Sequence, residues 1–218
     1  MENYYPVFLQ LKNRLCVVIG GGEVAFRKVD ALLECHASVR VVAPEAVQPL
    51  RELAALKRVE YLTAPYTRET LDGAFLAVAA TDNPAVNRTA AAHCRELRIP
   101  VNVVDAPELC DFILPATIRR GPLTLAVSTG GTAPAVARQI RRELEEKFDD
   151  AYGELLTVLG KTRIRVLSDI ADADRRKHIF TTLARDDLLT LLREKGRSAL
   201  EDRINELIGG SDAGNYYR

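Results

Sequence analysis

The stretch RLCVVIGGGEVAFRK, residues 14–28, decides the fold of this chain. Its apolar run at 14–20 predicts a buried strand, and the pattern at 23–35 has apolar residues at helical spacing. Between strand and helix, Gly20 and Gly22 match the spacing G-x-G-x-x-A together with Ala25. Such glycines allow a tight turn and a close approach of the backbone, and the start of the helix then faces a pyrophosphate. The stretch predicts a dinucleotide site; the alternative is a glycine-rich turn without a ligand.

Strand-like and helical patterns alternate outward from this stretch as far as residue 105. The strand-like runs are 14–20, 38–44, 59–64, 75–81 and 101–105, and the helical patterns are 23–35, 47–57 and 83–98. Such alternation predicts a parallel sheet that helices cover on both faces. We expect Asp82 or Asn83 to cap the last of these helices, with Pro84 at its first position.

The pattern changes after residue 105. Two strand-like runs, 112–119 and 123–128, predict an antiparallel hairpin, and a helix at about 133–148 follows it. Only helices are expected beyond, at about 150–167, 172–184, 186–195 and 197–208, before a loose tail at 211–218. The chain is therefore expected to be an α/β protein with a parallel-sheet domain at 1–112, a hairpin segment at 113–149 and a helical domain at 150–218.

Composition limits the possible functions. The chain has 218 residues, with 30 Lys and Arg against 30 Asp and Glu, and this balance argues against a general nucleic-acid binder. No apolar run is long enough to cross a bilayer, and the N-terminus lacks the pattern of a signal peptide, so we expect no membrane partner and a cytoplasmic location. The cysteines, Cys16, Cys35, Cys94 and Cys110, form no C-x-x-C pair and are expected to be small buried side chains.

Residues that follow the predicted strands are candidates for ligand contact, because the carboxyl ends of parallel strands line the crevice of such a sheet. Pro44 and Glu45 follow the second strand, where Glu45 is a candidate for the ribose hydroxyls or, alternatively, a solvated residue in the first turn of the next helix. No Arg or Lys stands there to receive a 2′-phosphate, which favours NAD over NADP. Thr81 and Asp82 close the fourth strand, and Asp82 is a ligand contact, a helix cap or both.

An acid, Asp105, closes the fifth strand. Its position directs it toward the cofactor region, and the alternative is a turn-capping Asp ahead of Pro107.

A second candidate site lies between the hairpin and the next helix. Ser128 and the glycine pair after it lie at a strand-to-helix junction, where backbone N–H groups hold anions. Cations that could receive the carboxylates of a substrate are Arg27, Lys28, Arg119, Arg120, Arg138, Arg141 and Arg142. The alternative is a solvated basic face that pairs with nearby glutamates. The histidines, His36, His93 and His178, each stand alone and receive no role.

The motifs YPVFLQLKNRLCVVIGGGEVAFRK, AATD, NVVDAPELCDFILPA and GPLTLAVSTGGTAPAVARQIR occur in this order. In them the chain closely resembles the precorrin-2 dehydrogenase family, the NAD-dependent dehydrogenase and ferrochelatase part of siroheme synthase. The resemblance covers about residues 4–150, and the helical remainder carries no motif.

The resemblance implies a Rossmann domain, a dimerisation segment that includes the hairpin, and a helical domain, in a homodimer. It implies transfer of a hydride from precorrin-2, a tetrapyrrole, to NAD⁺, giving sirohydrochlorin, and in many members insertion of Fe²⁺. The key acid of the family falls on Asp105, which could also hold the metal, and its motif serine falls on Ser128. The dinucleotide contacts fall on Glu23, Val24, Pro44 and Glu45. The competing hypothesis is an NAD-sensing module with a helical effector domain, which leaves Asp105 and the Ser128 junction unexplained.

Overall fold

The computed structural model describes residues 4–209, and the predicted tail at 211–218 lies outside them. The chain divides into two compact units, Met1–Leu114 and Pro115–Arg218, and each unit is described by itself. The finer division at residues 112 and 149 stays a prediction.

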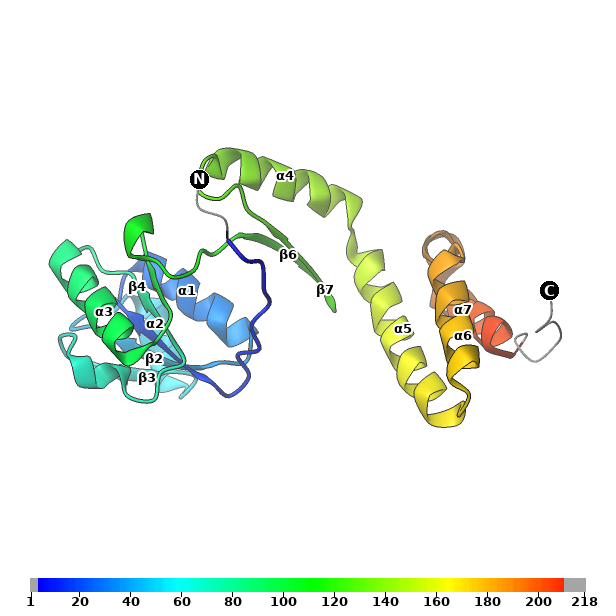
Figure 1. Ribbon diagram of the computed structural model, residues 1–218, viewed down its shortest axis with the longest axis horizontal. Helices are drawn as coiled ribbons and strands as arrows, with labels where there is room; N and C mark the ends of the chain where they lie inside the picture. The colour runs from blue at the N-terminus through cyan, green and yellow to red at the C-terminus, as the bar shows by residue number, and fades with distance from the viewer. Residues whose placement is uncertain (1–3, 210–218) are drawn as a thin grey trace. The chain divides into compact units, whose positions relative to one another are not determined.

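The first unit is a five-stranded parallel sheet with helices (Figure 1). The strands are β1 (Leu15–Ile19), β2 (Ser38–Val42), β3 (Glu60–Leu62), β4 (Leu76–Ala79) and β5 (Val101–Val103). The α-helices are α1 (Glu23–Glu34), α2 (Gln48–Ala55) and α3 (Pro84–Leu97), and the short 3₁₀ helices are η1 (Arg68–Leu71) and η2 (Pro107–Leu109). The strand order β3-β2-β1-β4-β5 is the Rossmann order, so the predicted fold class is confirmed.

Strand β1 shows why the sheet is covered on both faces. Cys16 and Val18 belong to the core cluster that contains Ala25 and Val29 of α1, whereas the alternate residues of β1 belong to the cluster on the α3 side. All four residues from Cys16 to Ile19 are at most 1% exposed. Both faces of the strand are therefore buried, and for this reason its sequence is continuously apolar and does not alternate between apolar and polar residues.

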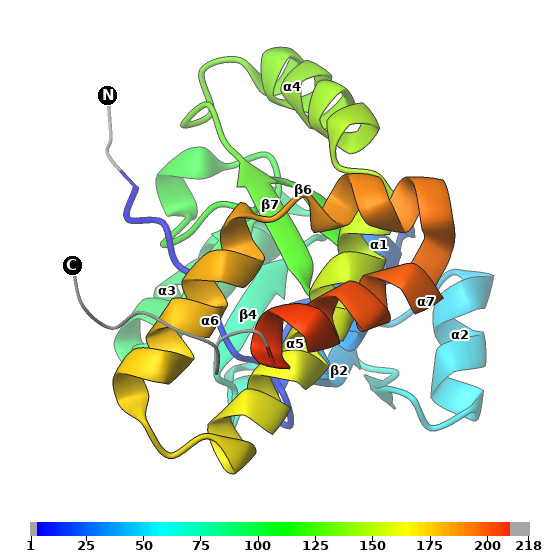
Figure 2. The same ribbon diagram turned by 90° about the vertical axis from the view of Figure 1, so that its right-hand side faces the viewer.

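The second unit consists of a hairpin and helices (Figure 2). Its elements are β6 (Ala116–Arg120), β7 (Leu123–Val127), α4 (Pro134–Lys147), α5 (Asp150–Asp169), α6 (Ala173–Arg185) and α7 (Leu188–Gly209). The strands pair antiparallel, as predicted. Gly196 interrupts α7 with a φ of 77°, between the two helices that the sequence predicts there.

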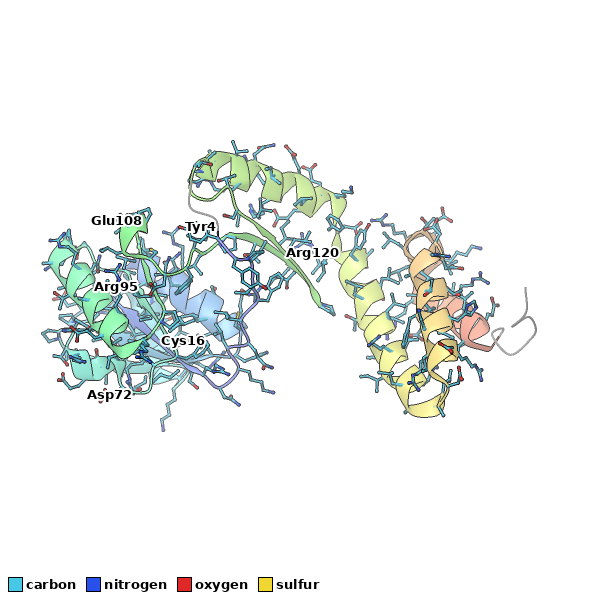
Figure 3. All side chains as sticks on the ribbon, viewed as in Figure 1. Tyr4, Cys16, Asp72, Arg95, Glu108 and Arg120 are labelled. Atoms are coloured by element: carbon cyan, nitrogen blue, oxygen red, sulfur yellow. The ribbon has the colours of Figure 1, made fainter. Side chains whose placement is uncertain are left out.

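The hairpin turn lies directly against α5. A Cβ on Gly153 would lie 2.8 Å from the Arg120 carbonyl carbon, and a Cβ on Gly121 would lie 3.1 Å from the Gly153 carbonyl oxygen. The Arg120 guanidinium, labelled in Figure 3, also forms an ion pair with Asp150 at 3.1 Å. Backbone therefore meets backbone at this contact, because neither glycine has a side chain. Within residues 4–209, none of the helices combines the length and the apolar character that crossing a membrane requires.

Candidate functional site

The three glycines after β1 have different surroundings. Gly20 has a φ of 129°, and a Cβ there would lie 2.4 Å from the Ala80 carbonyl oxygen. A Cβ on Gly21 would lie 1.9 Å from the Glu45 carbonyl oxygen, whereas a Cβ on Gly22 would meet no atom within 4 Å. The first two glycines thus allow neighbouring loops to approach, and Gly22 borders open space. The motif reading missed Gly21, since it occupies a variable position of the pattern.

Helix α1 begins at Glu23, immediately after this open position. Gly22 is its N-cap residue and supplies no side-chain cap bond. The first N–H groups of a helix have no partner within the helix, and the helix dipole adds partial positive charge there. Glu23 is exposed and Val24 is half-buried, while Ala25 is fully buried and holds the turn against the sheet. Open space, unpaired N–H groups and a favourable dipole are the features that a pyrophosphate requires, so the turn fits a dinucleotide.

The strand register brings the predicted site loops to one edge of the sheet. Ile19 pairs with Val42 on one side and with Ala79 on the other, and Ala79 pairs with Val103. The loops that follow these residues therefore begin at the same level. Since neighbouring strands lie about 4.8 Å apart, the loops after β2 and β5 are separated by about 14 Å, with the glycine turn between them. This edge is long enough for a ligand with two halves.

The β2–α2 loop carries Pro44 and Glu45, both exposed. The Val47 N–H donates to the Gly21 carbonyl oxygen at 2.8 Å, which holds the loop against the glycine turn. Helix α2 begins at Gln48, so the alternative that put Glu45 in the first turn of a helix is wrong. Glu45 instead lies in a loop whose backbone touches the dinucleotide turn.

The β4–α3 loop differs from the expectation. Of the two predicted caps, Asn83 caps α3 by accepting hydrogen bonds from the N–H groups of Ala85 and Val86, so Asp82 is not the cap. Asp82 is exposed. The Thr81 hydroxyl donates to Asn87 Oδ1 at 2.7 Å and accepts from the Asn83 N–H at 3.1 Å.

Asn87 is a site residue that sequence reasoning missed. It is 7% exposed, and its Nδ2 donates to the Thr81 carbonyl oxygen at 2.9 Å. Asn87 shares a helix face with the buried residues Ala90, Ala91 and Cys94. An amide on an otherwise apolar face was the signal available in the sequence. Its amide group fixes the shape of the loop beside the glycine turn.

Asp105 occupies a tight turn after β5. Its φ is 58°, a left-handed conformation that Gly, Asn and Asp adopt most readily, and its side chain is exposed. The Ala106 N–H closes the turn on the Val103 carbonyl oxygen at 3.3 Å, and the Val103 N–H donates to Cys110 Sγ at 3.1 Å. The carboxylate receives no hydrogen bond from any residue between 4 and 209, so it does not act as a cap. The backbone alone explains why the turn accepts an Asp, and the carboxylate is available for chemistry.

Lys28 brings a positive charge to the same region. It lies on α1 and is half-buried. Burial lowers the pKa of Lys28, the neighbouring Arg27 lowers it further, and the Asp105 carboxylate opposes both effects. A carboxylate and an ammonium group therefore act on one another at the β5 end of the edge. Such a pair can accept a proton and hold an anionic substituent of a substrate.

The loop after β5 is anchored on both sides. The Arg95 side chain on α3 donates to the carbonyl oxygen of Glu108 on η2 at 3.5 Å (Figure 3). Asp111 Oδ2 accepts the N–H of Val101 at 3.0 Å. These bonds join the segment that follows Asp105 to the sheet and to α3.

The Ser128 junction belongs to the second unit. Ser128 is exposed, and its Oγ accepts the Gly130 N–H at 3.0 Å. Thr129 Oγ1 accepts the Ala133 N–H at 3.2 Å, just before α4 begins at Pro134. Two backbone N–H groups of the junction are thus used by its own side chains, and an incoming anion would have to use others or displace them.

The predicted arginines divide into two groups. Arg120 forms an ion pair with Asp150, and Arg141 forms one with Glu145 at 2.5 Å. The pair on α4 agrees with the alternative prediction of a solvated basic face that pairs with nearby glutamates. Arg142 donates to Gln139 at 2.8 Å. Arg119 on β6 and Arg138 on α4 are exposed.

Cysteines and histidines carry no metal cluster in the described part of the chain, where no group of three or more His, Cys, Asp and Glu side chains could hold an ion. Cys16 and Cys94 are buried as predicted, whereas Cys35 and Cys110 are half-buried, and all four are free thiols. His93 does not stand alone, because its Nδ1 lies 3.0 Å from the Tyr66 hydroxyl.

Comparison with known proteins identifies the family of this chain. Residues 7–116 match the family model described as putative NAD(P)-binding. The chain belongs to this family. Residues 120–147 also match the model described as the sirohaem biosynthesis protein central segment. The two matches confirm the resemblance found in the sequence, and they account for most of both units up to the end of α4.

Relatives and solved structures agree with these matches. A siroheme synthase of Thioalkalivibrio sulfidiphilus is 38% identical over 216 residues, which cover 97% of this chain and 44% of that protein. A siroheme synthase of Methylobacillus flagellatus is 40% identical over 204 residues, which cover 92% of this chain and 44% of that protein. The chain thus spans less than half the length of these relatives. The solved structure of SirC, a precorrin-2 dehydrogenase, is 28% identical with a TM-score of 0.77, and the match covers 93% of this chain and 100% of that one.

Proposed function

We propose that this chain is an NAD-dependent precorrin-2 dehydrogenase that produces sirohydrochlorin. The observation that carries the proposal is the shared edge of the sheet, where an open glycine turn and the exposed Asp105 carboxylate lie two strands apart. The similarity to SirC and to siroheme synthases supports the choice of substrate. When bound, NAD⁺ would supply the hydride acceptor.

NAD rather than NADP is the proposed cofactor. The loop after β2 presents the exposed acid Glu45, and residues 43–47 contain no Lys or Arg. A carboxylate there accepts hydrogen bonds from ribose hydroxyls and repels a 2′-phosphate. Titration of the protein with NADH and NADPH, followed by fluorescence, should show tighter binding of NADH. Tighter binding of NADPH would contradict this role of the loop.

Asp105 is the proposed general base. The oxidation removes two electrons and one proton as a hydride, and a second proton must leave the substrate. The Asp105 carboxylate is exposed and accepts no hydrogen bond from the described residues, so it can take that proton, and the positive charge of Lys28 lies close enough to act on it. General-base assistance is typically worth about 10²–10⁴-fold in rate. The exposed aspartate also remains the proposed contact for Fe²⁺, should iron follow as a second substrate.

The decisive experiment replaces Asp105 by Asn. Because Asn tolerates the left-handed φ of 58°, Asp105→Asn removes the charge and keeps the turn. We expect a folded variant with unchanged NAD⁺ affinity and at least about a hundredfold slower anaerobic oxidation of precorrin-2. Asp105→Gly, which relieves the backbone strain and also lacks a carboxylate, should be equally slow. Near-normal turnover in both variants would show that Asp105 serves only the backbone turn. Binding of NAD⁺ by the unmodified protein without oxidation of precorrin-2 would instead favour the NAD-sensing module.

The second unit is proposed to receive the carboxylates of the substrate and to form a homodimer. Ser128, Arg119 and Arg138 are exposed, and Arg120 is half-buried and forms an ion pair with Asp150. A two-stranded hairpin has two unpaired edges and is marginal on its own, which favours pairing with a second copy. Sedimentation at several protein concentrations tests the dimer, and addition of Fe²⁺ to the sirohydrochlorin formed tests iron insertion.

A further inference from the structure

A basic cleft in the second unit contains none of the residues assigned to the proposed reaction. It is a wide open depression of about 520 Å³ on α5 and α6. Its lining residues are Arg163, Ala173, Arg176, Lys177, Phe180, Thr181, Ala184 and Arg185. Figures 1 and 2 both show these two helices side by side.

The charge of the cleft is one-sided. Four of its eight lining residues are cations and none is an acid, although acids and bases are equal in number over the whole chain. Asp174 lies three residues before Lys177, but no acid lies three or four residues from Arg163 or Arg185 along their helices. This differs from Arg141 and Arg197, which pair with Glu145 and Glu201 one turn along their helices. Pairing along the helix therefore does not explain why Arg163 and Arg185 are here.

The lining also has an apolar part. Residues Ala173, Phe180 and Ala184 follow one face of α6, while Ile179 and Leu183 on the neighbouring face belong to the helical core. Phe180 is half-buried, and the Arg163 guanidinium carbon lies 4.8 Å from the centre of its ring. The cleft thus combines an apolar floor, made of the half-buried Phe180 and two exposed alanines, with cationic side chains around it.

One of the four cations has a structural task. Arg176 Nη1 donates to the carbonyl oxygens of Ile170 and Ala171, at 2.8 and 2.7 Å, and so closes the end of α5. The Thr181 hydroxyl donates to the Lys177 carbonyl oxygen at 2.9 Å. Arg163, Lys177 and Arg185 are the side chains left to meet an anion.

We propose that this cleft is a binding site for an amphipathic polycarboxylate. Its carboxylates would pair with Arg163, Lys177 and Arg185, and its apolar body would lie on Phe180 and Ala184. Inorganic phosphate or a flexible acidic peptide would pair with the cations but would leave the apolar surface of Phe180 and Ala184 exposed to water. Both should therefore bind more weakly than an amphipathic polycarboxylate. Precorrin-2 carries eight carboxylates on an apolar macrocycle and belongs to this class, but that link rests on the proposed function.

The test is equilibrium binding of uroporphyrin, an octacarboxylate porphyrin, to the full chain by fluorescence at low salt. The variant Lys177→Glu/Arg185→Glu reverses two charges of the cleft. The control Lys161→Glu/Lys195→Glu makes the same change in net charge at two exposed lysines that do not line it. We expect at least about tenfold weaker binding for the cleft variant, equivalent to about 1.4 kcal/mol, and unchanged binding for the control. Equal effects of the two variants, with both folded by circular dichroism, would overturn the proposal.

Two further arms test the apolar floor and separate this proposal from the catalytic one. Inorganic phosphate and hexaglutamate should not displace uroporphyrin at matched carboxylate or phosphate concentration, and equal displacement by hexaglutamate would overturn an amphipathic site. Asp105→Asn should bind uroporphyrin in the cleft like the unmodified protein. Cleft binding without any oxidation of precorrin-2 would contradict the proposed function alone, whereas oxidation without cleft binding would contradict this inference alone.

Discussion

Replacement of Gly21 by Ala should destabilise the first unit, although a G-x-G-x-x-A pattern leaves this position open. The new Cβ would lie 1.9 Å from the Glu45 carbonyl oxygen and 2.9 Å from the Ala46 Cα, where real Cβ contacts are at least 3.0 Å. The β2–α2 loop must therefore move by about 1 Å or more, given that 3.0 Å limit. This movement strains the hydrogen bond from the Val47 N–H to the Gly21 carbonyl oxygen.

The expected cost follows from these two effects. Overpacking costs about 1–3 kcal/mol, and loss of a backbone hydrogen bond adds about 1 kcal/mol. A loss of about 2–4 kcal/mol in the free energy of unfolding should lower Tm by at least about 4 °C. Thermal unfolding followed by circular dichroism measures the shift, and titration with NADH measures cofactor binding.

Gly22→Ala is the matched control, because a Cβ there meets no atom within 4 Å and its φ of −83° suits alanine. We expect its Tm to stay within about 1 °C of the unmodified protein. Its NADH affinity should fall, since the methyl group occupies the space left for the pyrophosphate. A Gly21→Ala variant as stable as Gly22→Ala would refute the assignment of Gly21 to loop packing.

Three further predictions concern other parts of the molecule. Asn87→Ala should cost about 1–3 kcal/mol in urea unfolding, because it removes the side-chain partner of the half-buried Thr81 carbonyl and one of the partners of the Thr81 hydroxyl; a loss under about 0.5 kcal/mol would contradict this role. Ser128→Asp should slow oxidation of precorrin-2 while NADH affinity stays unchanged, and Ser128→Ala should be mild; equal rates for the aspartate variant and the unmodified protein would remove Ser128 from the site. Burial raises the pKa of Cys16 and of Cys94 to about 11, so both thiols stay protonated at about pH 8 and should resist iodoacetamide until the protein unfolds, which mass spectrometry would show.

Periodicity made the main elements predictable. Strands that are buried on both faces, such as β1, are continuously apolar, and the helices that cover them have apolar residues every three to four positions. Both patterns can be recognised without tertiary information. The Pro84 signal was equally local. Asp82 and Asn83 are both good capping residues, however, and only the geometry of the loop selects Asn83.

Contacts between distant residues were the part that the sequence could not supply. Phe112 continues the apolar run of the hairpin, yet it packs against the core of the first unit, and its carbonyl oxygen accepts a hydrogen bond from Asn102 Nδ2 at 3.0 Å. Strand β6 consequently starts at Ala116 rather than at residue 112. Gly21 was missed for a similar reason, because its constraint comes from a loop more than twenty residues away.

The glycine contact between the hairpin turn and α5 matters to anyone who builds chimaeras of this protein with its relatives. Because Gly121 and Gly153 have no side chains, the backbones of the hairpin turn and of α5 pack in direct contact. A shift of either segment by one residue would place a Cβ between these two backbones. The segment from β6 through the first turns of α5 should therefore be exchanged as one cassette. A crossover near Pro115 or beyond Thr157 takes the hairpin turn and the start of α5 from the same protein. A crossover inside α4 takes them from two different proteins, whose backbones have not been selected to pack together.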